Sequence, residues 1–227
     1  MKNLILIAVL FNASIFADYS NHKDSKVVID ELVNEHGFEE SYVINVLKQA
    51  KKRKTALNSV ARPAEKTKTW DDYRAIFLKK KRISDGKKFI QNNITVLERA
   101  EKDFGVPKEV ITAILGVETD YGNIMGSYRV IDSLTTLGFD DPRRSKFFKS
   151  ELIQFFILTR ENNLDILKVK GSYAGAMGYG QFISSSYRAY AIDFDGDGYV
   201  DLFNSLEDAI GSTANYLKRH GWKKEGS

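Results

Sequence analysis

The chain has 227 residues, a net charge of +4 at pH 7 and no cysteine. The lack of cysteine excludes disulfides, thiol catalysis and the acylated cysteine that anchors a lipoprotein. We therefore expect a chain without a stable membrane anchor, long enough for one well-filled core or for two lobes around a cleft.

Residues 1–17 have the pattern of a secretory signal peptide. Lys2 precedes a run of apolar residues, and the small residue Ala17 ends the segment. The run is too short to span a bilayer, which needs about 20 residues. We expect cleavage between Ala17 and Asp18, followed by export of the mature chain.

Two helices and a basic connection are predicted next. Residues 27–35 and 39–51 read as a helix pair interrupted at Gly37, and residues 51–68 as a surface connection. Residues 18–68 are therefore expected to form an N-terminal helical region with a basic linker. Residues 69–227 are expected to form the main domain.

The positive charge is concentrated in one part of the chain. Between Lys51 and Arg82 there are twelve basic and three acidic residues, a local charge of +9 that leaves −5 for the remainder. A basic face suits an anionic polymer, and a solvated helix face without a partner fits the same charge. Nucleic acid is a poor candidate, because the chain carries an export signal and no zinc-finger spacing or RNA-recognition motif.

The rest of the chain also predicts helices. They cover residues 70–81 after a Thr69 cap, residues 85–102, a helix that opens at Asp141-Pro142, and residues 206–219. No stretch keeps a period of two, so any β-sheet should be small. The helix after Pro142 carries aromatic and apolar residues that we expect in the core, namely Phe147, Phe148, Leu152, Phe155 and Phe156.

Glu118 is the first candidate for chemistry. It follows a mostly apolar helix that begins near Pro107, and it shares one helical stripe with Ile111 and Ile114. A carboxyl group on a buried stripe holds its proton more tightly than at its usual pKa of about 4.3 and can act as a general acid. Pairing with an arginine, or capping of a neighbouring helix, would account for the same residue.

A glycine-rich stretch from Lys170 to Phe182 is the second candidate. Four glycines allow close approach of the backbone to a ligand, aromatic rings can lie against sugar rings, and Ser172 and Gln181 offer hydrogen bonds. A flexible connection between helices would also be rich in glycine. The stretch contains no phosphate-binding loop motif.

The third candidate is a loop of alternating aspartates that begins at Asp193. Carboxylates occupy positions 1, 3, 5 and 9, glycine occupies position 6, and Tyr199 offers its carbonyl at position 7, as in an EF-hand calcium loop. Position 12 is Asn204, so the closing carboxylate must come from Glu207 or Asp208. Asp208 also has the spacing of a capping box with Ser205.

Together these segments resemble the lytic murein transglycosylase B family over roughly residues 30–222. The matching stretches are Arg62 to Glu65, Thr69 to Arg74, Gly116 to Gly122, Pro142 to Arg144, Lys170 to Phe182, the aspartate loop, and Ala209 to Trp222. The resemblance implies a mainly α fold with a lysozyme-like catalytic lobe, an additional N-terminal helical lobe and an EF-hand-like calcium loop.

The resemblance also assigns roles to residues. It implies that Glu118 is the single catalytic acid and base. It implies a glycan groove lined by Arg143, Arg144, Ser172, Met177, Gln181, Phe182 and Tyr216. It implies a structural calcium ion held by Asp193, Asp195, Asp197, Tyr199 and Asp208, with no organic cofactor.

The activity implied by the resemblance is cleavage of peptidoglycan in the bacterial periplasm. Ordinary glycosidases use two carboxylates, and the one nearest in sequence to Glu118, Asp120, turns about 200° away from it on a helix. A lone glutamate suffices if the 6-hydroxyl of muramic acid attacks and closes a 1,6-anhydro ring. Zinc and serine-nucleophile chemistry are disfavoured, because the three histidines are scattered and no G-x-S-x-G motif is present.

Two alternatives remain at the level of the sequence. Family members continue beyond the stretch His220 to Trp222 into a segment that completes the groove, whereas this sequence ends at Ser227. A short form, a truncated reading frame or a second polypeptide that supplies the missing wall would each fit. A calcium-stabilised peptidoglycan-binding protein without turnover is one alternative, and a hydrolase of the goose-lysozyme type is the other.

Overall fold

The computed structural model describes residues 18–62 and 68–223, so the predicted signal peptide lies outside the described residues. The described parts are mainly helical, as the sequence predicted. Their first elements are the 3-10 helix η1 (Tyr19–Asn21), α1 (Ser25–Asn34), α2 (Glu40–Gln49) and α3 (Lys54–Ala61). The chain continues through α4 (Trp70–Phe77), α5 (Lys80–Asn92), α6 (Ile94–Phe104), α7 (Lys108–Thr119), α8 (Val130–Asp140), α9 (Ser145–Glu161), α10 (Ser184–Tyr190) and α11 (Leu206–Arg219).

One hydrophobic core joins the N-terminal helices to α8 and α9. Side chains of α1 and α2 such as Leu32 and Leu47 are fully buried together with Phe155 and Phe156 of α9. Helix α8 lies in the middle, with every residue from Val130 to Phe139 buried. This core draws on residues from both sides of the domain boundary predicted at residue 68, and that boundary stays a prediction.

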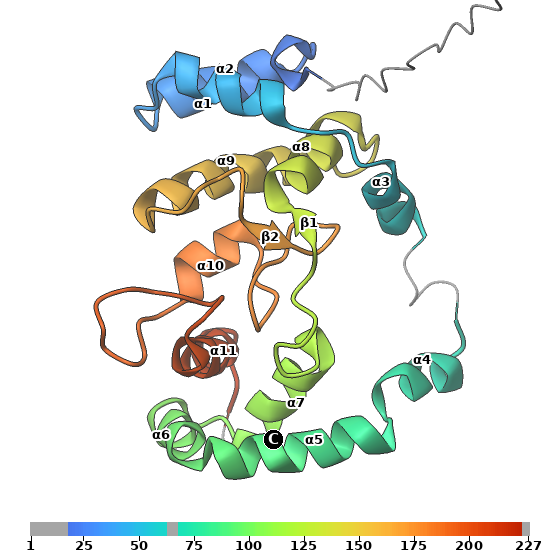
Figure 1. The fold of residues 1–227 in the computed structure, drawn as a ribbon, viewed down its shortest axis with the longest axis vertical. Helices are drawn as coiled ribbons and strands as arrows, with labels where there is room; N and C mark the ends of the chain where they lie inside the picture. Colours follow the sequence, from blue (N-terminus) through green and yellow to red (C-terminus); the bar gives the residue numbers. More distant parts are fainter. Residues whose placement is uncertain (1–17, 63–67, 224–227) are drawn as a thin grey trace, which may run out of the picture.

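A second core lies at the opposite end of the molecule, where α5 and α6 pack with α7 and α11 (Figure 1). Its buried side chains include Leu97, Ile111, Leu115 and Ile210. The only two strands among the described residues form a small antiparallel sheet. In it β1 (Tyr128–Arg129) pairs with β2 (Lys170–Gly171).

The predicted helix over residues 85–102 is wrong, because two helices meet there at Asn93. The backbone of Asn93 leaves the helical region at φ −124°, and the Asn93 side-chain amide donates to the carbonyl of Phe89 at 2.8 Å. An asparagine side chain that bonds to nearby backbone competes with the helical ladder. The break turns the chain so that α6 packs on α11.

The predicted helix over residues 70–81 is too long, and a helix in the basic segment was missed. Helix α4 ends at Phe77, Lys79 is extended, and α5 starts at Lys80. Residues 51–68 contain α3, which packs on α8 through the buried Ala56. The last helix, predicted over residues 206–219, is confirmed as α11.

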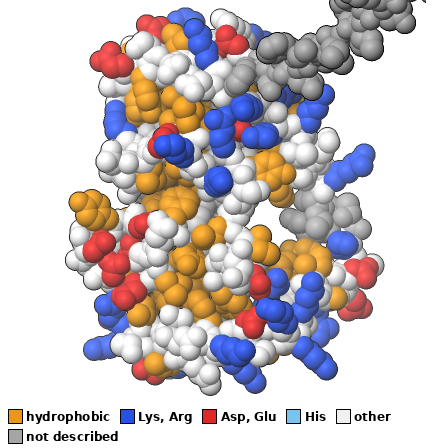
Figure 2. Space-filling model, in the orientation of Figure 1, with side chains coloured by type: hydrophobic (Ala, Val, Ile, Leu, Met, Phe, Trp, Pro, Cys, Tyr) orange, Lys and Arg blue, Asp and Glu red, His pale blue; other side chains and the backbone are white. Residues whose placement is uncertain are grey.

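Figure 2 shows one face of the molecule, on which hydrophobic side chains lie in both the upper and the lower half and Lys and Arg side chains are spread around them. Among the residues that the structure describes, no helix has both the length and the apolar character needed to cross a membrane.

A buried carboxylate ties the basic segment to α8. Asp132 is fully buried, and its oxygens accept hydrogen bonds from the guanidinium groups of Arg53 and Arg129 and from the backbone N–H of Lys51. Both arginines remain partly solvated, with 36% and 24% of their side chains exposed. The carboxylate therefore gains two counter-charges and a backbone donor in place of water.

Replacing Asp132 with alanine should lower the free energy of unfolding by about 3 kcal/mol, because two guanidinium groups then face each other without a counter-charge. Urea unfolding followed by circular dichroism measures the loss. The matched control is Asp165→Ala, which removes an exposed pair with Lys168 and should cost less than about 1 kcal/mol. Equal losses for the two variants would contradict the role given to Asp132.

Candidate active site

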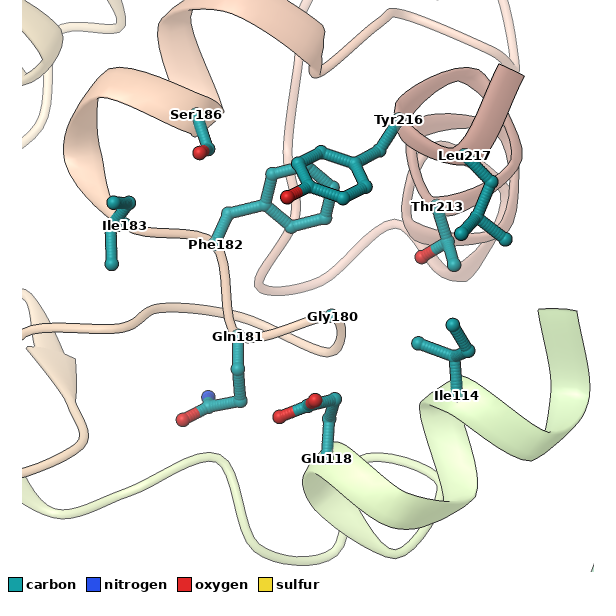
Figure 3. Close-up of a pocket in the computed structure, with 10 residues that line it drawn as sticks. All are labelled: Ile114, Glu118, Gly180, Gln181, Phe182, Ile183, Ser186, Thr213, Tyr216 and Leu217. Carbon is teal, nitrogen blue, oxygen red and sulfur yellow. The ribbon is translucent and has the colours of Figure 1, made fainter. Parts of the chain in front are cut away.

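A pocket of about 310 Å³ lies where α7, α10 and α11 meet the glycine-rich stretch (Figure 3). Its walls combine one carboxylate, one amide, three hydroxyl groups, two aromatic rings and aliphatic side chains. The residues that line it are Ile114, Glu118, Gly180, Gln181, Phe182, Ile183, Ser186, Thr213, Tyr216 and Leu217.

Glu118 projects into this pocket from the last turn of α7 (Figure 3). The expectation that it lies on a buried stripe is wrong, because Ile111 is buried and Ile114 half-buried while the Glu118 side chain is exposed. The pocket is concave, however, and protein atoms displace much of the water around the carboxylate. This partial burial raises the pKa of Glu118 above its ordinary value.

Glu118 is the only carboxylate among the lining residues of this pocket. Asp120, two positions later, lies outside the helix in a left-handed conformation and pairs with Arg82 at 3.5 Å. The sequence-based expectation assumed that the helix continues through Asp120, whereas α7 ends at Thr119; Asp120 nevertheless does not line the pocket. Any reaction in the pocket therefore has one carboxyl group to move protons.

The hydroxyl group of Thr119 fixes Glu118 relative to the glycine-rich stretch. Thr119 is buried, its hydroxyl donates to the carbonyl of Tyr179 at 2.8 Å, and the same oxygen accepts the backbone N–H of Gly122 at 3.0 Å. The bond joins the end of α7 to a segment 60 residues away. The carboxylate next to Thr119 thereby gains a defined position against the opposite wall.

Gln181 forms part of that wall and has a strained backbone. Its φ of +50° is uncommon for a residue with a side chain. Its side-chain nitrogen donates to the carbonyls of Met125 and Gly178 at 3.3 and 3.0 Å. These bonds use the amide nitrogen and leave the amide oxygen as an acceptor, which points away from the Glu118 carboxylate in Figure 3.

An aromatic wall stands opposite the carboxylate. The rings of Phe182 and Tyr216 meet edge to face, with centroids 5.6 Å apart. Gly180 allows this arrangement, because a β-carbon there would lie 2.7 Å from the Phe182 ring. Apolar ring faces next to hydroxyl and amide groups match the mixed apolar and polar surface of a sugar.

The predicted catalytic residue and the seven predicted groove residues fall into two sets. Glu118, Gln181, Phe182 and Tyr216 come together in the pocket, and the other four do not line it. Met177 is fully buried and pairs with Phe182 in an isolated β-bridge. The Ser172 hydroxyl accepts the N–H groups of Ala174 and Ala176 and so braces the glycine-rich stretch.

Arg143 and Arg144 lie in the loop between α8 and α9. Their backbone N–H groups both donate to Asp141, and the guanidinium of Arg144 lies over the Phe147 ring at 4.6 Å. Both side chains are exposed. Their contact with a glycan stays a prediction.

Two polar lining residues were missed by the sequence reasoning. Thr213 stands three residues before Tyr216 on α11, a spacing that places both on one helical face, so the helix itself could have indicated it. Ser186 lies in the first turn of α10, a helix that the sequence did not predict. Nothing local marks Ser186 as part of the pocket.

The aspartate loop gathers three carboxylates. Oxygen atoms of Asp193, Asp195 and Asp197 all lie within 4.8 Å of one another, and the three residues are exposed. The hydroxyl of Ser205 donates to Asp195 at 2.6 Å, and this bond lowers the pKa of that carboxyl. Carboxylate oxygens at this density are the ligands that Ca²⁺ prefers, so the donor set fits this ion.

The Asp208 side chain binds the backbone of the aspartate loop. It is buried, one oxygen accepts the N–H groups of Phe194 and Asp195, and the other accepts that of Asp201. Burial raises its pKa even though three backbone donors oppose the rise. The Ser205 hydroxyl caps α11 by accepting the N–H of Asp208. Metal ligation by Asp208 and by the carbonyl of Tyr199 stays a prediction.

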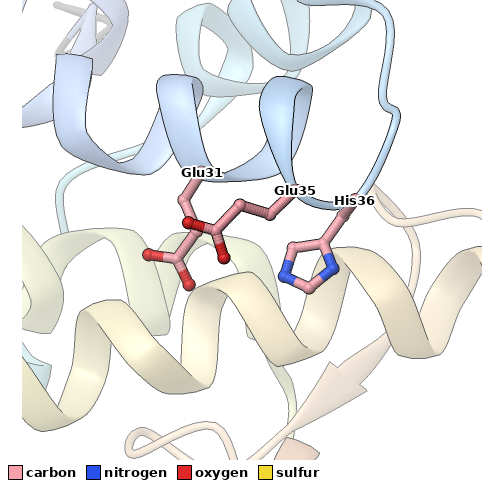
Figure 4. A group of neighbouring side chains, drawn as sticks. All are labelled: Glu31, Glu35 and His36. Atoms are coloured by element: carbon pink, nitrogen blue, oxygen red, sulfur yellow. The ribbon is translucent and has the colours of Figure 1, made fainter.

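A further group of possible metal ligands lies at the end of α1. Figure 4 shows Glu31, Glu35 and His36 with their side chains turned toward one another, and their ligand atoms lie within 4.8 Å. Glu35 is exposed and the other two are half-buried. No second observation points to a bound ion at this group.

The comparisons with known proteins agree with the geometry of the pocket. The sequence matches the model of the transglycosylase SLT domain over residues 21–227. The chain belongs to this family.

Relatives of this transglycosylase SLT domain include a curated protein and several solved structures. The chain is 42% identical over 216 residues to membrane-bound lytic murein transglycosylase B of Escherichia coli K12, and the match covers 91% of the chain and 60% of the relative. The lytic transglycosylase Slt35 of Escherichia coli, solved in complex with calcium, is 42% identical with a TM-score of 0.86, covering 92% of the chain and 67% of Slt35.

A more distant relative is SltB3 of Pseudomonas aeruginosa, solved in complex with NAG-anhNAM-pentapeptide. It is 29% identical, with a TM-score of 0.74, and the match covers 87% of the chain and 52% of SltB3. The chain thus spans about 60% of the length of the curated relative and about half of SltB3.

The raised pKa of Glu118 predicts how stability depends on pH. A carboxyl group whose pKa is higher in the folded protein contributes stability below its unfolded pKa, and this contribution is lost as pH rises through the folded pKa. At pH 7 the Glu118→Gln variant should therefore melt at the same temperature as the parent or higher. The difference should close as pH falls toward about 4.

Differential scanning calorimetry from pH 4 to pH 8 measures this dependence. Glu98→Gln, at an exposed position on α6, is the control that removes the same charge. A Glu118→Gln variant that melts several degrees below the parent at pH 7 would show that a partner stabilises the carboxylate.

Proposed function

We propose that the chain is a lytic transglycosylase that cleaves the β-1,4 bond between N-acetylmuramic acid and N-acetylglucosamine in peptidoglycan. The single observation that carries the proposal is a pocket with one carboxylate, Glu118, whose pKa is raised, facing an aromatic wall. Membership of the transglycosylase SLT domain family and the names of the relatives support it.

Glu118 supplies both proton transfers of this reaction. As a carboxylic acid it protonates the glycosidic oxygen, and the bond between that oxygen and C1 of the muramic acid breaks. The 6-hydroxyl of the same sugar then attacks C1 and gives its proton to the Glu118 carboxylate. The glutamate returns to its starting state, no water is consumed, and the product ends in 1,6-anhydromuramic acid.

The remaining pocket residues orient the glycan. Phe182 and Tyr216 offer ring faces to the sugars, while the amide oxygen of Gln181 and the hydroxyls of Ser186 and Thr213 offer hydrogen bonds. The complex of the relative SltB3 with NAG-anhNAM-pentapeptide supports a peptidoglycan fragment as the ligand. A substrate of this kind supports a periplasmic location, which the predicted signal peptide would also require.

Replacing Glu118 with glutamine should reduce the release of soluble muropeptides by a factor of at least about 10² to 10⁴, because the amide cannot transfer a proton. The fold and sedimentation with murein should be retained. The control is Glu98→Gln, which should cleave at the rate of the parent.

Mass spectrometry of the parent's products in ¹⁸O-labelled water identifies the reaction. Anhydro ends lack the mass of one water and carry no label, whereas a hydrolase of the goose-lysozyme type leaves labelled reducing ends. Murein that is bound but left intact by the parent would identify a binding protein and refute the enzymatic proposal.

We also propose that the aspartate loop binds a structural calcium ion through Asp193, Asp195 and Asp197. Their oxygens are close enough for one cation, which would cancel the repulsion among three negative charges. The complex of the relative Slt35 with calcium supports this assignment. The loop is anchored to α11 by Asp208, so the ion would act on stability rather than on the chemical step.

Calcium at about ten times its dissociation constant should stabilise the protein by roughly 1.4 kcal/mol, or about 3 to 6 °C in melting temperature. Asp195→Ala should remove most of this shift. Asp71→Ala removes an exposed acid on α4 and should leave the shift unchanged. Identical melting curves of the parent with calcium and with chelator, at up to about 10 mM calcium, would exclude the site.

A further inference from the structure

A histidine stacks on one of the two rings that form the aromatic wall of the pocket. His220 lies at the end of α11, and its imidazole stacks on the ring of Tyr216, with centroids 4.0 Å apart and planes 25° from parallel. Tyr216 lines the pocket and His220 does not, so the imidazole contacts the Tyr216 ring without itself forming part of the lining.

Two more rings complete this support. Tyr190, the last residue of α10, meets Tyr216 edge to face at 5.2 Å and His220 at 4.8 Å. The guanidinium of Arg219 lies over Tyr190 at 5.5 Å, and the side chain of Asn215 donates to the carbonyl of Tyr190 at 2.8 Å. The end of α10 and the last turn of α11 are thereby joined through rings that surround Tyr216.

His220 also serves as a helix cap. A carbonyl oxygen only accepts, so the imidazole Nδ1–H donates to the carbonyl of Tyr216, at 2.7 Å. Asparagine does the same work at two other helix ends of this protein. Asn93 donates to Phe89 at the end of α5, and Asn162 donates to Leu158 at the end of α9, at 2.8 and 3.0 Å. Capping therefore explains a donor at position 220 but not a ring.

We propose that His220 is the positioning residue for Tyr216 and fixes its ring in the orientation that the glycan meets. A tyrosine on a helix has more than one accessible rotamer, and a ring that must be immobilised during binding costs affinity. The imidazole removes that freedom before the sugar arrives. This inference rests on the proposed function, because it assigns the wall that Tyr216 forms to the substrate.

Three variants of His220 distinguish the effect of the stacked ring from the effect of the capping hydrogen bond. His220→Asn keeps a donor for the Tyr216 carbonyl and removes the stacked ring. His220→Phe keeps a ring and removes the donor, and His220→Ala removes both. Lys218→Ala, an exposed position on the same turn, is the control.

Binding of the soluble tetramer of N-acetylglucosamine is measured by calorimetry in the Glu118→Gln background. We expect about 2- to 10-fold weaker binding for His220→Asn and His220→Ala, and binding within about 2-fold of the parent for His220→Phe. With murein and an intact Glu118, KM should rise by the same factor while kcat stays nearly unchanged. Melting temperature should follow the capping bond instead, with His220→Asn closest to the parent and His220→Phe and His220→Ala below it.

Affinity of His220→Asn equal to that of the parent would overturn the proposal, because His220 would then be a cap and nothing more. Binding by His220→Phe as weak as by His220→Ala would overturn it as well. A parent that neither cleaves murein nor binds the tetramer would refute the proposed function instead.

If the parent neither cleaves murein nor binds the tetramer, the motion of the Tyr216 ring still tests whether His220 positions it. Aromatic NMR signals of Tyr216 should show slow ring flipping in the parent and in His220→Phe, and faster flipping in His220→Asn. Equal flipping rates in the parent and His220→Asn would overturn the claim.

Discussion

The hydrogen bond between the Thr119 hydroxyl and the Tyr179 carbonyl is the constraint on which the pocket depends. One wall comes from the end of α7 and the other from the glycine-rich stretch, whose regular structure is limited to the two-residue strand β2 and the bridge between Met177 and Phe182. Such a stretch cannot set its own distance from a helix. The Thr119 oxygen does so by donating to the stretch and accepting from Gly122, and the catalytic candidate is its direct neighbour. A carboxylate with a raised pKa is useful only at a fixed distance from the bond that it protonates.

The pocket also lies where the two hydrophobic cores meet. Phe182 and Tyr216 belong to the core built around α8 and α9, whereas Leu217, the neighbour of Tyr216, packs against the core of α5, α6 and α7. Adjacent residues of α11 thus reach into different cores and hold the wall between them. The aromatic wall needs both cores to stay rigid. A loss of packing in either core would therefore alter the shape of the pocket without altering the Glu118 carboxyl group itself.

The sequence predicted what depends on local patterns and missed what depends on distant contacts. Glu118 was identified because an apolar helix leads to it, and α11 was placed to the residue because Ser205 caps it and Gly221 follows it. Helix α8 was missed although Val130, Ile131, Leu134 and Leu137 recur with helical spacing, because no capping side chain marks its start. The placement of Gln181 beside Glu118 rests on a positive φ and on a bond to Met125, and neither follows from neighbouring residues. Ser172 and Met177, which the resemblance assigns to the groove, brace the stretch that forms its wall, and their contact with a glycan stays a prediction.

The aspartate loop acts on the same wall through α11. Asp208 accepts three N–H groups of the loop with its side chain and lies in the first turn of the helix whose later turns carry Thr213 and Tyr216. Negative side chains in the first turn also suit the positive end of the helix dipole. The three exposed aspartates repel one another unless a cation lies between them, and Asp208 and Ser205 connect the loop to the first turn of α11. A cation in the loop would therefore stabilise the start of α11, while His220 and Tyr190 hold its other end, so the helix that carries the aromatic wall is fixed at both ends by contacts outside the pocket.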